Sequence, residues 1–120
     1  MKVVTMNQVP KQGAESPLFT GAVTRQDLLS GDMTKFFNVV IINFGKGVRN
    51  KFHTHTSDQV LLVTEGIGIV ATEDEEITVT AGDVIHIPAG EKHWHGATKD
   101  TEFSHINLIK SDSQTEQLEL

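Results

Sequence analysis

The chain has 120 residues, of which 38% are hydrophobic and 22% charged, a composition typical of one globular domain with its own buried core. Sixteen acidic and ten basic residues leave a formal net charge of −6, which argues against nucleic acid and anionic membranes as partners. There is no cysteine, and this excludes disulfides, thiolate metal sites and cysteine nucleophiles.

The two ends of the chain differ from its middle. Residues 1–17 hold two of the three prolines and little periodicity, so we expect an arm that lies on the domain or on a partner subunit. This start is too polar for a secretory signal, and no segment reaches the ~20 apolar residues of a membrane helix, so we expect a cytoplasmic protein. Residues 111–120 are acidic and predict a frayed or accessory tail. The domain itself is expected to span residues 18–110.

The elements between these ends are predominantly strands. The first candidate, RQDLLSG at 25–31, predicts a short helix or an irregular turn. Residues 36–44 are rich in β-branched and aromatic residues at both parities, which is typical of a strand covered on both faces, and a turn follows at 45–50. Further strands are predicted at 59–66 and 66–73, which meet near Gly66, at both ends of 76–90, and at 91–98 and 102–110. Seven or eight short strands predict an all-β fold, either an antiparallel barrel or a sandwich.

The histidines are placed in pairs that suit a strand. Residues i and i+2 of a strand point to the same face, so His53 and His55 can offer two imidazoles to one metal ion. Gln59 follows at the same parity. His93 and His95 form a second such pair, and each pair alone could equally be a chance feature of a polar loop. The last two histidines fall elsewhere: His105 in the final strand, and His86 alone on an apolar strand, where we interpret it as structural.

The glycines and prolines around these pairs have a recognisable spacing. The first segment runs Gly47, five residues, the His53–His55 pair, three residues, Gln59, six residues and Gly66. The second runs Gly82, five residues, Pro88-Ala89-Gly90, two residues and His93. This pattern resembles the two motifs of the cupin superfamily, whose members are small jelly-roll β-barrels. The resemblance implies that His53, His55, Gln59 and His93 bind a divalent metal inside the barrel.

The motifs depart from the family pattern at two positions. Gln59 replaces the usual glutamate, and Ala97 replaces an asparagine. A glutamine can ligate through its amide oxygen but brings no charge, so the ion should be a stronger Lewis acid and should be held less tightly. Imidazole and amide ligands do not choose one metal. The resemblance favours manganese or iron, with zinc or nickel as alternatives.

The likeness extends to a subgroup of small single-domain bacterial cupins. Residues 19–23, 53–68 and 90–97 are similar to a group that includes manganese-dependent hydroxynitrile lyases. In that group His95 and His105 match auxiliary histidines, which implies a catalytic role, with His95 as a neutral base beside the metal. Ile109 stands where a polar residue would help to bind substrate or cyanide, and this departure weakens the case for lyase activity.

Several functions therefore remain open. The leading hypothesis is a metal-dependent enzyme acting on a small molecule with a hydroxyl or carbonyl group, by lyase, isomerase or decarboxylase chemistry. A metal-dependent dioxygenase is the main variant, and a non-enzymatic ligand-binding module or a structural cupin are the other readings. An apolar pocket wall is expected from one face of 36–44, either Val40, Ile42 and Phe44 or the alternate set. Because a small barrel has sheet edges to protect, we expect a homodimer, with a tetramer as alternative.

Overall fold

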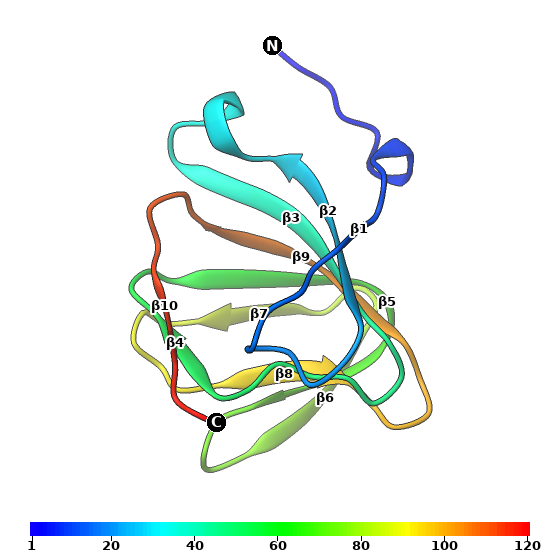
Figure 1. Cartoon of the computed structure of the whole chain (residues 1–120), viewed down its shortest axis with the longest axis vertical. Helices are drawn as coiled ribbons and strands as arrows, with labels where there is room; N and C mark the ends of the chain where they lie inside the picture. Colours follow the sequence, from blue (N-terminus) through cyan, green and yellow to red (C-terminus); the bar gives the residue numbers. More distant parts are fainter.

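Ten strands and two single-turn 3₁₀ helices account for the regular structure of the computed structural model, which describes residues 1–120 (Figure 1). The helices are η1 (Met6–Gln8) and η2 (Gly31–Met33), and neither is long enough to span a membrane. The strands are β1 (Gln12–Gly13), β2 (Val23–Leu29), β3 (Phe37–Phe44), β4 (His53–His55), β5 (Gln59–Ala71), β6 (Glu76–Thr80), β7 (Val84–Ile87), β8 (Trp94–Ala97), β9 (Phe103–Lys110) and β10 (Thr115–Gln117). All pairings between them are antiparallel, so the all-β prediction is confirmed.

Strand β5 is the centre of the barrel. The sheet order is β1-β2-β3-β9-β5-β6, and β7 and β8 also pair with β5. The first part of β5 pairs with β7 and β9, and the second part pairs with β6 and β8. The change falls at Gly66, which has φ 77° and whose Cβ, if present, would lie 1.9 Å from the Glu102 carbonyl oxygen. The two strands expected to meet near Gly66 are therefore one continuous strand that changes partners there.

The helix predicted at 25–31 is wrong. Those residues belong mostly to β2, which pairs along its length with β3. Pairing with the apolar strand β3 outweighs the weak local helix preference of this short segment. A register shift between Asp27 and Leu29 marks an irregularity where the strand ends.

The core lies between the inner faces of the strands. Its buried cluster is Val23, Phe44, Leu61, Val63, Val70, Val79, Ile87, Ala97 and Phe103. Phe44 belongs to this cluster and Ile42 packs against it, so the face of β3 that carries these two residues lines the barrel. The Phe44 ring stacks on Phe103 at 6.0 Å and meets the His95 ring edge-on at 5.8 Å between centroids. The apolar core thus directly supports a buried histidine.

Part of each terminal segment pairs with the barrel. In the N-terminal arm β1 pairs with β2, and the Gln26 side chain donates hydrogen bonds to the carbonyl oxygens of Met6 and Val9. At the other end β10 pairs with β4, where Figure 1 draws the red C-terminal strand across the green β4. Within the tail expected to be frayed or accessory, residues 115–117 thus form an ordered strand.

Candidate metal centre

Two short segments bring three histidines together. His53 and His55 lie on β4, and His93 immediately precedes β8. The backbones of His53 and His93 bond to each other in both directions, at 3.0 and 3.1 Å. The ring centroids lie 4.9 Å apart for His53–His55, 4.2 Å for His53–His93 and 5.4 Å for His55–His93. One nitrogen from each ring lies within 4.8 Å of the other two, a separation that one bound cation can bridge.

The Nδ1 atom of each of these three rings is hydrogen-bonded to an oxygen atom. Nδ1 of His53 donates to the Lys51 carbonyl at 2.6 Å, and Nδ1 of His93 donates to the Glu91 carbonyl at 2.8 Å. Because a carbonyl can only accept, each proton sits on Nδ1 and each Nε2 keeps a free lone pair. Nδ1 of His55 meets the Thr115 hydroxyl oxygen at 2.9 Å, and its Nε2 is buried without a hydrogen-bond partner. Metal-ligating histidines are oriented in this way, so the three side chains fit a divalent cation.

Gln59 lies beside this cluster. Its Oε1 is 3.2 Å from His93 Nε2, and its Nε2 donates to Asn107 Oδ1 at 2.6 Å. Because the side-chain nitrogen of Gln59 is hydrogen-bonded to Asn107, the side-chain oxygen of Gln59 is the atom that faces the histidines. Asn107 was not among the predicted residues, although it shares the parity of His105 on the same strand and that signal could have identified it.

Burial keeps the three histidines neutral. It lowers the pKa of His53 to about 3 and that of His55 to about 4, with a further contribution from the neighbouring His93 in both cases. Burial also lowers the pKa of His93. At neutral pH the rings therefore carry lone pairs rather than positive charge, and a cation can bind without displacing protons.

The second pair of predicted residues forms a hydrogen-bonded chain with Asn50. Asn50 Oδ1 accepts the His95 backbone N–H at 2.8 Å, so its Nδ2 is the atom 3.2 Å from His95 Nε2. An amide nitrogen only donates, so His95 carries its proton on Nδ1 and donates it to His105 Nε2 at 3.2 Å. The proton of His105 therefore sits on Nδ1, which is buried and has no partner.

This chain changes what His95 can do. Its ring lies 5.8 Å from His93 and 5.9 Å from His53 between centroids, close to the three histidines as expected, but both of its ring nitrogens are engaged. Burial, followed by the neighbouring His105, lowers the pKa of His95 well below its usual value. Burial lowers the pKa of His105 to about 4. Of the ring nitrogens of this pair, only Nδ1 of His105 has no hydrogen-bond partner.

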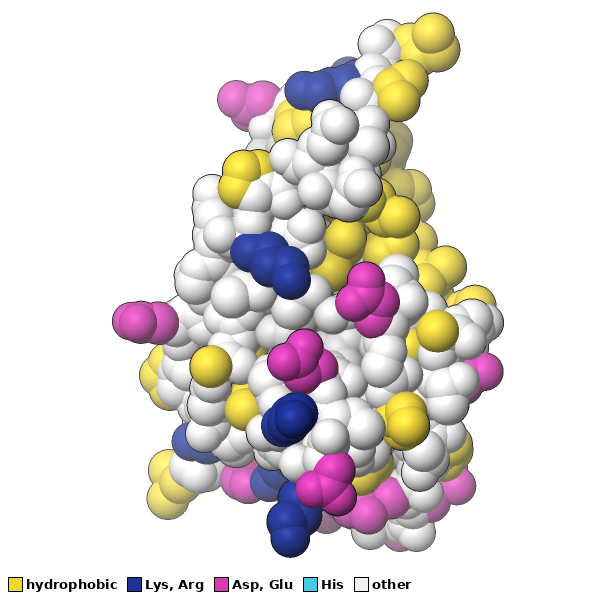
Figure 2. Space-filling view, turned by 90° about the vertical axis from the view of Figure 1, so that its right-hand side faces the viewer, with side chains coloured by type: hydrophobic (Ala, Val, Ile, Leu, Met, Phe, Trp, Pro, Cys, Tyr) yellow, Lys and Arg dark blue, Asp and Glu magenta, His cyan; other side chains and the backbone are white.

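The remaining predicted positions lie around the centre. His86 is exposed at the surface, where its Nε2 pairs with Asp58 at 2.9 Å, as a structural histidine would. Ile109 pairs with Gln59 across β9 and β5, so an apolar side chain neighbours the amide. No histidine reaches the surface on the face drawn in Figure 2, where acidic side chains gather at the lower end.

An apolar cleft adjoins the cluster on the β6–β7 side. It has a volume of about 140 Å³, and His93 forms part of its wall. The rest of its lining is mainly apolar: Val70, Ala71, Ile77, Ile85, Ile87 and Trp94, with Thr72, Glu75, His86 and Glu91. A cleft of this size has room only for a small chemical group.

Comparison with known proteins identifies the fold family. A family model described as "Cupin domain" matches residues 40–108. An (R)-mandelonitrile lyase from Granulicella tundricola is 35% identical over 91 residues, which cover 75% of this chain and 70% of that protein. An acireductone dioxygenase from Parasynechococcus marenigrum is 43% identical over 56 residues, which cover 41% of this chain and only 30% of that protein.

A solved structure supports the same assignment. A cupin-like protein from Thermotoga maritima superimposes with a TM-score of 0.83 and 31% identity, covering 89% of this chain and 84% of that one. The matched region contains both histidine pairs and the glutamine between them. The chain therefore belongs to the cupin family.

Proposed function

We propose that this cupin is a metal-dependent enzyme that acts on a small molecule bearing a hydroxyl or carbonyl group, by lyase-type chemistry. The observation that carries the proposal is the convergence of three neutral histidines whose ligand atoms lie within 4.8 Å of one another. The 35% identity to a mandelonitrile lyase over three quarters of the chain supports this reaction class and makes cyanohydrins the first substrates to test.

The metal would be held by Nε2 of His53, His55 and His93 and by Oε1 of Gln59. This donor set is neutral and does not by itself choose between metals. Manganese or iron is proposed first from the likeness to metal-dependent cupins, with zinc or nickel as alternatives. When bound, such an ion supplies a Lewis acid that polarises a substrate oxygen. Asn107 contributes by holding the amide of Gln59 with its oxygen toward the site.

His105 and His95 would handle the charge that develops on the substrate. The unpartnered Nδ1–H of His105 can donate a hydrogen bond to a substrate oxygen or to a leaving anion. His95 acts through His105, because its own Nδ1 proton already bonds His105 Nε2. To serve as the base proposed from the sequence, His95 would have to release Asn50 from Nε2. Burial of the pair excludes water and strengthens each of these interactions.

The first experiment measures metal content and activity together. Protein prepared without added metal is loaded separately with manganese, iron, zinc or nickel, and bound metal is quantified by elemental analysis. Each form is assayed with cyanohydrins, small hydroxy acids and alkenyl aromatics. Activity that requires the metal and is lost in His105→Ala, with metal content unchanged, supports the proposal. A protein that binds none of these metals, or that binds a ligand and returns it unchanged, refutes it.

A second candidate function is that of a metal-dependent dioxygenase. Its support is the similarity to acireductone dioxygenases, of which the chain spans less than half in the two cases at 43% and 34% identity. The two chemistries differ in their need for oxygen and for a redox-active ion. Activity that disappears under anaerobic conditions, or when zinc replaces iron, favours the dioxygenase.

We further propose that the protein is cytoplasmic and forms a homodimer. Support for the dimer comes from apolar side chains left exposed near the start of β3, namely Met33, Phe36 and Phe37. Light scattering coupled to size-exclusion chromatography measures the mass in solution. A monomer at high concentration would rule out the dimer.

A further inference from the structure

We infer that the C-terminal segment 114–119 is part of the metal centre, with Thr115 as the residue that positions His55. The inference rests on the proposed metal site and extends it to a part of the chain outside both motifs. Thr115 lies outside the region matched by the family model, which ends at residue 108.

The C-terminal strand is the sheet partner of the strand that carries two of the ligands. Strands β10 and β4 form a separate two-stranded sheet, with Thr115 opposite His55 and Gln117 opposite His53. Backbone hydrogen bonds continue beyond both ends: Thr56 N–H donates to the Gln114 carbonyl at 3.0 Å, and the next such bond lies at the far end of β4, from Leu118 N–H to the Phe52 carbonyl at 2.8 Å. Apart from the bridge to His93, the tail is therefore the only strand against which β4 is aligned.

His55 depends on the tail in a way that the other two histidines do not. His53 and His93 each take their Nδ1 partner from a carbonyl two residues earlier in the chain, so the local backbone provides it. The Nδ1 partner of His55 is the Thr115 hydroxyl, sixty residues away. The His55 ring can therefore keep its Nε2 toward the other ligands only while the tail is in place.

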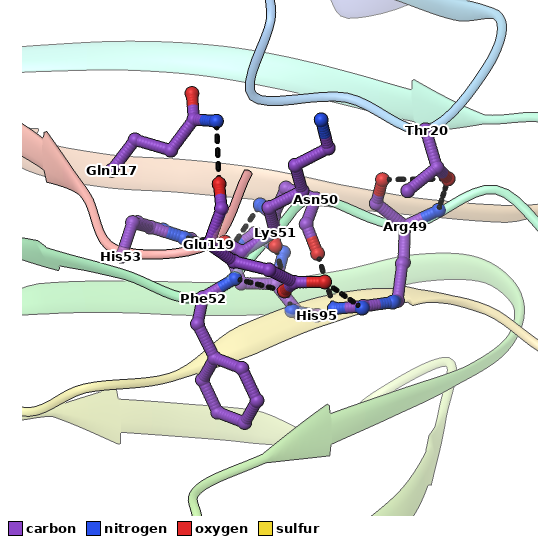
Figure 3. A network of polar contacts seen from close by, with 9 residues as sticks. All are labelled: Thr20, Arg49, Asn50, Lys51, Phe52, His53, His95, Gln117 and Glu119. Atoms are coloured by element: carbon purple, nitrogen blue, oxygen red, sulfur yellow. Dashed lines mark hydrogen bonds and ion pairs between the residues drawn. The ribbon is translucent and has the colours of Figure 1, made fainter.

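A carboxylate at the end of the tail fixes this arrangement (Figure 3). Glu119 Oε1 accepts the Phe52 N–H at 2.8 Å, and Oε2 pairs with the Arg49 guanidinium at 2.7 Å. Arg49 also donates to the Asn50 carbonyl, and its guanidinium lies 4.6 Å above the Trp94 ring.

Arg49 and Phe52, the two residues that Glu119 binds, flank the two residues that orient the histidines. Asn50 holds His95, and the carbonyl of Lys51 holds His53. One network in Figure 3 thus connects the tail to the ring orientation of both histidines. The tail thus binds the chain on both sides of residues 50–51, the segment that orients His95 and His53.

The test uses full-length variants and measures metal affinity apart from activity. Thr115→Val keeps the shape of the side chain but removes the hydroxyl, and Thr115→Ser keeps the hydroxyl. Affinities for zinc and manganese are measured by chelator competition. We expect Thr115→Val to bind metal about 10–100-fold more weakly, as is typical when the partner of a ligating histidine is lost, and Thr115→Ser to restore affinity.

Two controls separate positioning from general stability. Thr78 is exposed on β6, a strand that carries none of the three clustered histidines, so Thr78→Val makes the same chemical change outside the cluster and should bind metal like the unaltered protein. The unfolding midpoint of metal-free Thr115→Val should match that of Thr78→Val. The nitrogen chemical shifts of His55, measured by NMR without metal, should change in Thr115→Val alone.

The outcomes distinguish this inference from the proposed function. If Thr115→Val binds metal as tightly as the unaltered chain while His55→Ala does not bind, the metal site stands and the positioning role of Thr115 is refuted. If Thr115→Ser is as weak as Thr115→Val, the hydroxyl is not the important group and the inference is again refuted. If the unaltered chain binds no metal, the proposed function and the inference fail together.

Discussion

Acidification of the metal-free protein should lower its free energy of unfolding well before its carboxylates are neutralised. The folded chain holds His53 with a pKa of about 3 and His105 with a pKa of about 4, whereas an unfolded histidine titrates near 6.5. Because both folded values are lowered, the unfolded state binds more protons below pH 6.5. The stability is thus fully present above pH 6.5 and is lost as the pH falls toward 4.

The size of the effect follows from burial. At pH 5 the unfolded chain has bound a proton at nearly every histidine, while folded His53 and His105 have not. Because pH 5 lies about 1.5 units below the unfolded pKa of 6.5, each of these two histidines lowers the free energy of unfolding by about 2 kcal/mol at that pH. Together they lower it by about 4 kcal/mol. His55, with a pKa of about 4, adds to the loss in the same direction. This is a large fraction of the roughly 5–15 kcal/mol that stabilises a typical domain.

The assay is urea unfolding of chelator-treated protein at several pH values between 7 and 5. His105→Gln should remove one of the titrating groups and make the slope of unfolding free energy against pH shallower. Thr78→Val, which alters no titratable group, serves as the comparison and should leave that slope unchanged. A free energy of unfolding that stays level from pH 7 to pH 5 would contradict the reasoning.

Three other substitutions have defined outcomes. Gln59→Glu should bind a divalent ion at least about tenfold more tightly, because the carboxylate adds a negative charge, and unchanged affinity in chelator competition would mean that this side chain does not ligate. Gly68→Ala should reduce the free energy of unfolding by about 1–3 kcal/mol, because its Cβ would lie 2.6 Å from the Phe103 ring, and denaturant unfolding at the unaltered midpoint would count against this close packing. Asn50→Asp should move the His95 proton to Nε2, because a carboxylate only accepts, and unchanged nitrogen chemical shifts of that ring would disprove the proposed proton positions.

The sequence predicted correctly those features whose determining residues are neighbours in the chain. The pairing of His53 with His55 was predicted from the strand pleat, which acts locally, and His93 was added through the resemblance of the two motifs to those of the cupin superfamily. The order of strands followed from turn residues and from runs of β-branched side chains. The helix expected at 25–31 failed because a contact with β3, outside the segment, decides its conformation.

The supporting residues were harder to find because their partners are distant. Thr115 meets His55 across sixty positions, and Asn50 meets His95 across forty-five, with no local pattern to indicate either contact. Asn107 was accessible from the alternation of β9 but was overlooked. The residues proposed as ligands could therefore be named from the sequence, while the groups that orient them become visible only when remote segments are folded together.

The partner change of β5 at Gly66 has a consequence for how the barrel comes apart. Because one continuous strand is paired on both sides in each half of the barrel, its removal would disrupt both halves, and the amides of β5 should be among the slowest to exchange with solvent. The same arrangement makes most pairings long-range in the chain, so the protein should fold slowly for its length and in one concerted step.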